Sequence, residues 1–430
     1  MLTVAYLANQ FPAAVEPYVS EEIEELRRRG VRVIPGSVRR PDVTQSMSAT
    51  APFEPEILCL QPLRVLTLLR ALGLAARRWK RIADLAQVVL HGKESPKRRL
   101  KALLHTWLGA CYAVQLRERG VDHIHVHHGY FGSWIAMVAA RLLGVSYSLT
   151  LHGSDLLIDG AYLGTKLGNC RFCTTVSEYN RRHILEHFPA VDSGKIVVSR
   201  LGVDVPEHVE SPRRVARGSR HTLTLLAVGR LHAVKDHAFL VRACAGLRDR
   251  GLDFECAIAG EGPERQHLEL LIREKRLEDR IALLGHVPRE QMYSLYRRAD
   301  VVVLTSRSEG IPLVLMEAMA RGKIVLAPAI TGIPEIVIPG KTGFLYAAGK
   351  MDDFVARTLL LGELTRAEDG WGVSRLDWLR HAARVQVLHN FNRRKNLTRF
   401  GDRFLQRIAP EDFVSQDWSS PHEDFVLQQV

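Results

Sequence analysis

The sequence lacks several features that define whole classes of protein. Its longest apolar run, from Phe131 to Ala140, stops at Arg141, well short of the roughly 18 residues that cross a bilayer. The first residues, Met1-Leu2-Thr3-Val4, lead directly into a predicted strand and show no signal-peptide pattern. Internal repeats and low-complexity tracts are missing as well. We therefore expect a cytoplasmic protein without a membrane span.

Cysteine is also scarce, with six residues in a chain of 430, and a secreted disulfide scaffold is excluded. Cys170 and Cys173 have the spacing of a CxxC motif, but the segment from Arg171 to Val176 is a predicted strand. Residues three apart on a strand point to opposite faces. Because the sequence has no second such pair, we predict neither a metal-binding nor a redox role for them.

Metal-binding carboxylate clusters of the DxD type, which could hold Mg²⁺, are not found either. His123, His125 and His127 share one face of a predicted strand, which allows two interpretations. One is a zinc site. The other is a polar strand end that faces a ligand cleft, with His127 contacting a substrate. We favour the second, since no cysteine or carboxylate lies at ligand spacing in the sequence, and we expect no metal.

Positive charge is abundant, with a formal net charge of +12, and it is unevenly spread. Residues 61–101 carry eleven lysines and arginines against two acidic residues, a net +9, interleaved with leucines and Trp79. A basic amphipathic helix of this kind suits an anionic membrane surface. The alternative is a solvated helix face packed on its own domain. Nucleic-acid binding is not expected, because no recognition motif accompanies the charge.

Apolar strands alternate with helical stretches at spacings of about 20–30 residues, which predicts an α/β fold with parallel sheets. The length favours two domains. We predict a first Rossmann-like domain over 1–205 and a second over 206–377, joined by a linker at 205–220. Helices over 378–410 should return to the first domain, and 411–430 should form a tail.

The segment from Ser308 to Ala320 is the most informative of the chain. Glu309 falls in a loop after the predicted strand 300–304, Pro312 suits the first turn of a helix, and Glu317 lies inside that helix. Free backbone N–H groups at the helix start form an anion site. A lone glutamate on an apolar helix needs a polar partner, and a sugar nucleotide would supply one. The alternative is that Glu317 points to water.

A second motif follows the predicted strand 222–229, which ends at Gly229. Arg230 and Lys235 come next, and a helix is predicted to begin near Asp236. Two cations beside a helix N-terminus can bind a diphosphate, although solvated loop charges would give the same pattern. Ligands of parallel sheets bind beyond the carboxyl ends of the strands, and both motifs lie at such ends.

Together these segments resemble the retaining glycosyltransferases of the family 4 type, which have the two-Rossmann-domain architecture called GT-B. The His-rich strand and His152-Gly153-Ser154-Asp155 resemble the colanic acid and exopolysaccharide branch, and the resemblance covers most of residues 1–400. The motifs that carry it in the second half are Gly229-Arg230 with Lys235, Gly260-Glu261-Gly262-Pro263, Ser306 with Glu309-Gly310-Ile311-Pro312 and Glu317, Gly332 to Val337, and Gly340 to Leu345.

The resemblance implies a metal-independent, retaining hexosyltransferase that needs no cofactor. It would move a sugar from a UDP- or GDP-linked donor to a lipid-linked saccharide in exopolysaccharide, capsule or lipopolysaccharide biosynthesis. The implied catalytic residues are His152, Glu309, Arg230 and Lys235. The implied donor-binding residues are Gly229, Arg230, Lys235, Gly260, Gly262, Val287, Ser306, Glu309, Gly310, Ile311, Pro312, Leu313 and Glu317.

For the acceptor or the cleft we single out Asn9, Gln10, His127 and Asp155. Many relatives have a Gly-Gly loop after the first strand, whereas the predicted loop here, Asn9 to Ala13, has no glycine, so donor contacts from that loop cannot be carried over. Two other functions stay open. One is a GT-B enzyme with a soluble small-molecule acceptor, and the other is a non-catalytic protein that binds sugar nucleotides.

Overall fold

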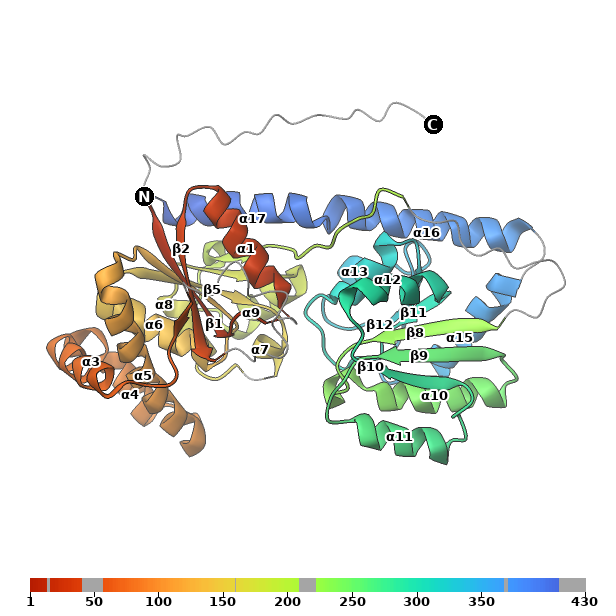
Figure 1. Cartoon of the computed structure of the whole chain (residues 1–430), viewed down its shortest axis with the longest axis horizontal. Helices are drawn as coiled ribbons and strands as arrows, with labels where there is room; N and C mark the ends of the chain where they lie inside the picture. The colour runs from red at the N-terminus through yellow and green to blue at the C-terminus, as the bar shows by residue number, and fades with distance from the viewer. Residues whose placement is uncertain (14–15, 41–56, 159, 209–221, 367–369, 410–430) are drawn as a thin grey trace, which may run out of the picture.

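The computed structural model describes residues 1–13, 16–40, 57–158, 160–208, 222–366 and 370–409. These residues form two parallel β-sheets flanked by helices, which make two lobes side by side (Figure 1). The first sheet has the strand order β3-β2-β1-β4-β5-β6-β7, and the second has the order β10-β9-β8-β11-β12-β13. In the part of the chain that the structure describes, no helix is both long and apolar enough to span a bilayer.

The first lobe holds the strands β1 to β7 and the helices α1 to α9. Its strands are β1 (Thr3–Gln10), β2 (Arg32–Arg39), β3 (Leu58–Cys59), β4 (His123–His127), β5 (Ser146–Leu151), β6 (Phe172–Thr175) and β7 (Ile196–Val198). Its helices are α1 (Pro17–Arg28), α3 (Val65–Arg77), α4 (Ala83–His91), α5 (Pro96–Leu116), α6 (Phe131–Leu143), α7 (Ser154–Leu157), α8 (Leu163–Asn169) and α9 (Glu178–His187), with short 3-10 turns η1 (Trp79–Arg81), η2 (Arg117–Arg119) and η3 (Ser193–Lys195).

The second lobe holds the remaining strands, and the last two helices run along both lobes. The strands are β8 (Leu223–Val228), β9 (Phe254–Ala259), β10 (Ile281–Gly285), β11 (Val301–Val303), β12 (Ile324–Pro328) and β13 (Phe344–Tyr346). The helices are α10 (His237–Asp249), α11 (Arg265–Glu274), α12 (Arg289–Arg298), α13 (Leu313–Ala320), α14 (Ile333–Ile336), α15 (Met351–Arg366), α16 (Gly370–Asn390) and α17 (Arg393–Ile408), with the 3-10 turn η4 (Ala233–Lys235).

One central strand in each sheet is buried along its whole length, as expected when helices cover a parallel sheet on both faces. All five residues of β4 and all three of β11 are buried. Side-chain caps start several of the covering helices, with Ser95 at α5, Ser177 at α9 and Asp236 at α10 each accepting a backbone N–H.

Two chain crossings connect the lobes and lie against each other. Val203 N donates to Phe391 O at 2.9 Å, and Arg393 N donates to Val203 O at 3.1 Å. A Cβ on Gly202 would lie 2.6 Å from the backbone N of Arg393, so the two crossings are in backbone contact. Figure 1 shows α16 along the second lobe and α17 along the first. The helical stretch predicted from 378 is thus two helices that break at residues 391–392.

Several sequence predictions need correction. Asn9 and Gln10 belong to β1, which is longer than the strand predicted from Leu2 to Leu7. Residues 61–101 form α3, η1, α4 and the start of α5 rather than one helix. Cys170 caps the C-terminal end of α8, while Cys173 lies in β6, and both are free thiols. Most of the predicted linker and the whole predicted tail, 411–430, lie outside the described residues.

Candidate active site

Lys235 and Glu309, which the sequence analysis singled out in separate motifs, form an ion pair in the second lobe. Lys235, at the end of η4, donates from Nζ to Glu309 Oε1 at 2.5 Å. Ser306 Oγ, from the loop after β11, donates to the same oxygen at 2.6 Å. The Lys235 and Glu309 side chains are 20% and 10% exposed, so the pair is largely buried but still accessible to a ligand. Two loops that follow neighbouring strands are therefore joined by their functional side chains.

The glycines of the second lobe allow loops to approach each other closely. A Cβ on Gly260 would lie 1.9 Å from Gly229 O, and a Cβ on Gly262 would lie 2.3 Å from Leu231 O. Both have positive φ, at 150° and 157°, a conformation that side chains disfavour. These glycines hold the loop that carries Arg230. Val287 is half-buried after β10.

The predicted helix is α13, which begins at Leu313, but Pro312 is its N-cap rather than a residue of its first turn. Glu317 is half-buried, and its Oε2 accepts a hydrogen bond from Tyr296 Oη at 2.8 Å. The polar partner expected for Glu317 is thus partly supplied by the protein itself, through Tyr296 of α12. Ile311 and Pro312 are buried, and Ile311 packs in one apolar cluster with Val176 of the first lobe.

The two lobes touch at the backbone of the candidate site. A Cβ added to Gly310 would lie 1.6 Å from His152 O, and one added to Gly153 would lie 2.8 Å from Gly310 N. Glu335 of α14 reinforces this contact, because its carboxylate accepts from Tyr179 N at 2.7 Å and from Glu178 N at 3.1 Å, in the first turn of α9. The structure thus brings His152 and Glu309-Gly310 together.

The side chain of His152 is held by aromatic and imidazole neighbours of the first lobe. Its Nε2 lies 3.0 Å from His127 Nδ1, and Tyr18 of α1 stacks on the ring with centroids 4.5 Å apart. Burial, followed by the positive charge of His128, lowers the pKa of His152 well below its usual value. A neutral imidazole therefore faces the contact between the lobes.

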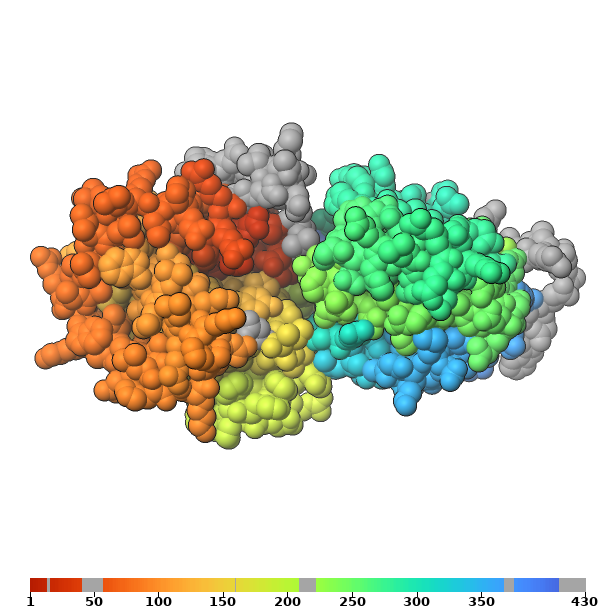
Figure 2. Space-filling view, turned by 90° about the horizontal axis from the view of Figure 1, so that it is seen from below, coloured from red at the N-terminus to blue at the C-terminus, as the bar shows by residue number. Residues whose placement is uncertain are grey.

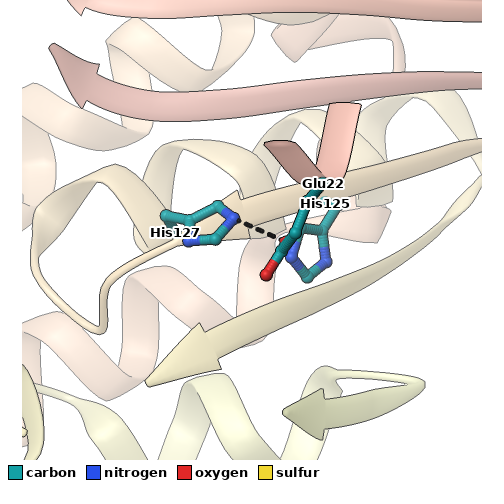
Figure 3. A group of neighbouring side chains, drawn as sticks. All are labelled: Glu22, His125 and His127. Atoms are coloured by element: carbon teal, nitrogen blue, oxygen red, sulfur yellow. Dashed lines mark hydrogen bonds and ion pairs between the residues drawn. The ribbon is translucent and has the colours of Figure 1, made fainter. Parts of the chain in front are cut away.

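Behind His127 lies a carboxylate that the sequence analysis missed. Glu22 of α1 has an oxygen 3.1 Å from His127 Nε2, and it also accepts a hydrogen bond from Tyr6 Oη. Together with His125 these side chains form a group whose ligand-type atoms all lie within 4.8 Å of one another (Figure 3). Glu22 is one of two buried acids of α1, with Glu25, beside the buried apolar residues Val19, Ile23 and Leu26. An acid on the apolar face of a helix is the signal that drew attention to Glu317.

A carboxylate thus lies beside these histidines in the folded protein, although none lies at ligand spacing along the sequence. The two nitrogens of His125 already pair with Ser148 Oγ at 2.7 Å and with Thr150 Oγ1 at 3.0 Å. Burial lowers the pKa of His125 well below its usual value. Cys173 is separate from this group, and burial raises its pKa.

Asp155 has an internal role that the sequence did not predict. It is fully buried, and its carboxylate accepts from the backbone N atoms of Gly129, His152 and Gly153 at 2.8, 3.1 and 2.8 Å. His128 Nδ1 lies 3.7 Å from it. Burial alone would raise the pKa of Asp155, but these partners lower it well below its usual value. Asp155 therefore orients the loop that carries His152.

His128 carries a positive charge at this loop. Burial alone would lower its pKa, but the contacts with Asp155 and with Glu16, at 2.9 Å, raise the pKa to about 10. In Glu16, the effect of burial is outweighed mainly by the hydrogen bond with His128 and its charge, with a smaller effect of Arg230, and the pKa is lowered. Arg230 is itself exposed. At the end of β1, Asn9 is exposed and Gln10 is half-buried.

Comparison with known proteins identifies the class that this fold and site define. The structure of Alr3699/HepE from Anabaena in complex with UDP and glucose superposes with a TM-score of 0.67, covering 94% of this chain and 100% of that one at 16% identity. The fold is thus GT-B, with two Rossmann-like domains. Residues 15–207 match the model of glycosyltransferase family 4, and residues 214–368 match that of glycosyl transferases group 1.

The chain belongs to glycosyltransferase family 4. WcaL of Escherichia coli strain K12, whose name places it among colanic acid biosynthesis glycosyltransferases, is 34% identical over 204 residues, or 46% of this chain. The chain spans about half of that relative, 48% of its length. The alpha-D-kanosaminyltransferase of Streptomyces kanamyceticus is 34% identical over 270 residues, which cover 56% of this chain and 69% of that protein.

Proposed function

We propose that the protein is a retaining glycosyltransferase that moves a sugar from a UDP- or GDP-linked donor to a lipid-linked saccharide. The observation that carries the proposal is the meeting of two half-sites. Lys235 and Glu309 of the second lobe lie at the backbone contact where Gly310 touches His152 of the first lobe. A donor held by one lobe and an acceptor held by the other would react at this contact.

Each half-site residue has a role that follows from its chemistry. Lys235 and the exposed Arg230 neutralise the charge that grows on the leaving nucleoside diphosphate. Glu309 accepts from a sugar hydroxyl, and the backbone N–H groups from Gly310 to Leu313 bind sugar or phosphate. Glu317, oriented by Tyr296, accepts from the ribose hydroxyls through the oxygen that Tyr296 does not use. His152 faces the sugar from the first lobe.

The stereochemical part of the proposal is retention, with an α-linked product from an α-linked donor. The departing phosphate oxygen helps to deprotonate the acceptor, and no covalent intermediate is invoked. We also propose that no metal ion is needed, because two cations and a helix N-terminus neutralise the diphosphate. Activity should therefore persist in excess EDTA. Loss of activity in EDTA with rescue by Mg²⁺ or Mn²⁺ would overturn this part.

The acceptor class is supported by the outer end of the first lobe, where α3 to α5 lie away from the second lobe (Figure 2). These helices expose a large group of apolar side chains, which monomeric proteins rarely do without a binding role. Its members are Val65, Leu66, Leu69 and Leu72 of α3, Trp79 of η1, Leu90 of α4, and Leu100, Leu103 and Leu104 of α5. We call this group the apolar end.

Exposed cations lie on the same elements as the apolar end. They are Arg64, Arg70, Arg77, Lys80, Lys93, Lys97 and Lys101. Arg78 and Arg81 are different, because they donate to the backbone carbonyls of Leu142 and Arg141 at the end of α6. We propose that the apolar end and its cations bind an anionic membrane surface and bring the enzyme to a lipid-linked acceptor. The match to a kanosaminyltransferase favours a second candidate, a soluble small-molecule acceptor.

The proposed function is tested by donor screening followed by a transfer assay. UDP-, GDP- and ADP-sugars are added separately, and a donor present at 100 times its dissociation constant should stabilise the protein by about 2.7 kcal/mol. Transfer is then measured with a polyprenyl-linked saccharide and with a soluble aminocyclitol. Stabilisation without transfer or donor hydrolysis would indicate a protein that only binds sugar nucleotides.

A further inference from the structure

A buried chain of hydrogen bonds runs through the first lobe and ends at His152. Tyr6 Oη donates to Glu22 Oε2, the same carboxylate oxygen lies 3.1 Å from His127 Nε2, and His127 Nδ1 lies 3.0 Å from His152 Nε2. The Glu22 and His127 side chains are 6% and 0% exposed. Figure 3 shows Glu22 and His127 directed toward each other from α1 and β4. Solvent cannot readily replace any link of this chain.

The chemistry of the groups fixes the direction of each bond. An ionised carboxylate can only accept a hydrogen bond, so His127 Nε2 must carry the hydrogen and donate to Glu22. With His127 neutral, its Nδ1 is an acceptor, and His152 Nε2 must donate to it. A neutral His152 with its proton on Nε2 has an unprotonated Nδ1. The carboxylate thus determines, through one intervening ring, which nitrogen of His152 accepts hydrogen bonds.

The position of His152 makes that nitrogen useful. Its carbonyl lies against Gly310 of the second lobe, one face of its ring is stacked on Tyr18, and the residue is half-buried. Among the described residues, none forms a hydrogen bond with His152 Nδ1. Asp155 holds the backbone of the same residue, with an oxygen 3.1 Å from His152 N. The ring is therefore fixed in place at the contact of the lobes, with one acceptor left over.

A metal ion is the competing explanation for this cluster. Glu22, His125 and His127 offer ligand-type atoms within 4.8 Å of one another, and two histidines with a carboxylate would suit zinc. However, both ring nitrogens of His125 already form hydrogen bonds, with Ser148 and Thr150. His127 and Glu22 lie at hydrogen-bond distance from each other. The contacts are thus explained by hydrogen bonds, and a bound metal becomes one outcome of the test.

We propose that Glu22 and His127 are positioning residues that hold His152 in the tautomer with a free Nδ1, and that this Nδ1 accepts a hydrogen bond from a sugar or acceptor hydroxyl in the cleft. The proposal rests on the proposed function, since it names the group that receives the hydroxyl. It adds two buried residues that act through His152, one of them on the helix α1.

The first test compares Glu22→Leu with Glu22→Gln. Leucine leaves Tyr6 Oη as the remaining partner of His127 Nε2, at 3.2 Å. Because a phenol donates readily, His127 and then His152 should switch tautomers. We expect kcat to fall about 10- to 100-fold, the scale seen when the partner of a functional histidine is removed. Glutamine can still accept through its amide oxygen and should restore most of the activity. Glu24→Gln, exposed on the same helix, is the matched control.

A double-mutant cycle separates positioning from a structural role. If Glu22 acts through the imidazole of His152, Glu22→Leu should cause no further loss of kcat in the His152→Ala background. The dissociation constant of the nucleotide, which binds in the second lobe, should be the same in every variant. An equal loss of kcat in both backgrounds, or weaker nucleotide binding in Glu22→Leu, would overturn the proposal.

The tautomers can also be read directly, without any assay of activity. Long-range ¹H–¹⁵N spectra of ¹⁵N-histidine-labelled protein, assigned with His127→Asn and His152→Asn, should show the His152 proton on Nε2. A proton on Nδ1 would refute the proposal even if transferase activity is present. The expected tautomer in a protein without transfer activity would instead count against the proposed function alone. Stoichiometric zinc in elemental analysis of the full chain would overturn the hydrogen-bonded assignment.

Discussion

The two sheets bring different chemistry to the contact between the lobes. The first sheet contributes His127 and His152, which are buried or half-buried and already paired with protein groups. The second contributes Arg230, which is exposed, and Lys235, which keeps 20% exposure beside Glu309. Side chains locked by internal partners set geometry, whereas exposed cations are available to an incoming charge. We therefore expect substitutions in the second lobe to affect charge stabilisation and those in the first to affect alignment.

The largest loss of activity should follow substitution of the two cations of the second lobe. Lys235→Ala and Arg230→Ala should each lower kcat about 10²- to 10³-fold, because a preorganised group that stabilises the leaving diphosphate is lost. The fold should survive, since Glu309 keeps its hydrogen bond from Ser306. Turnover is measured with the donor identified by screening, and Lys341→Ala, an exposed lysine of the same lobe, serves as the control. Wild-type rates in both variants would refute the donor-site assignment.

Alignment across the lobes is tested at Gly310. A Cβ there would meet His152 O at 1.6 Å, so Gly310→Ala must push the lobes apart by moving backbone. A misplacement on this scale can cost about 10²-fold in rate, and we expect a loss of that order in kcat. Gly168→Ala, where an added Cβ would meet no atom within 4 Å, should behave like the wild type. Normal turnover in Gly310→Ala would show that the contact is not part of the reactive state.

Substitutions at the outer end of the first lobe should weaken membrane binding. This effect is smaller, and substitutions in the catalytic half-sites should not cause it. Each cation near an anionic membrane contributes about 1 kcal/mol, so replacing Arg70 and Arg77 by glutamine should weaken vesicle binding about 30-fold. Co-sedimentation with anionic and neutral vesicles measures the change. Binding by the wild type should disappear at 1 M salt, where the Debye length is about 3 Å.

The matched control for this experiment is Lys341→Gln with Lys350→Gln, which removes the same charge from exposed sites of the second lobe. It should leave vesicle binding unchanged. Equal binding of the wild type to neutral vesicles, or none to anionic ones, would show that α3 to α5 form only a solvated surface. The lipid-linked acceptor would then lose its main support.

The sequence predicted the second half-site better than the first, for a physical reason. Gly229, Lys235 and Glu309 stand at the ends of apolar strands and beside helix starts, so local patterns reveal them. Glu22 and His127 come from different elements, and only the packing of α1 on the sheet brings them together. The break of residues 61–101 into several helices was missed for a related reason, since basic residues such as Arg78 form tertiary contacts that periodicity does not encode.

The smallest expected effect concerns the charge that fixes the loop of His152. The pKa of His128 in the folded protein is about 10, above the usual value of about 6.5 in an unfolded chain. Its protonation therefore adds stability that is fully present below pH 6.5 and is lost as the pH rises toward 10. His128→Asn, which suits the positive φ of 70° at this position, should destabilise the protein by about 1.5 kcal/mol at pH 6.

The destabilisation caused by His128→Asn should decrease steadily as the pH is raised to 10. Urea unfolding at a series of pH values measures it. His105→Asn provides a control of opposite sign, because burial lowers the pKa of His105, so that its protonation disfavours the folded state at low pH. Replacing His105 should therefore favour the folded protein more at low pH than at high pH. A destabilisation by His128→Asn that is the same at pH 6 and pH 10 would show that His128 holds the loop by shape and not by charge.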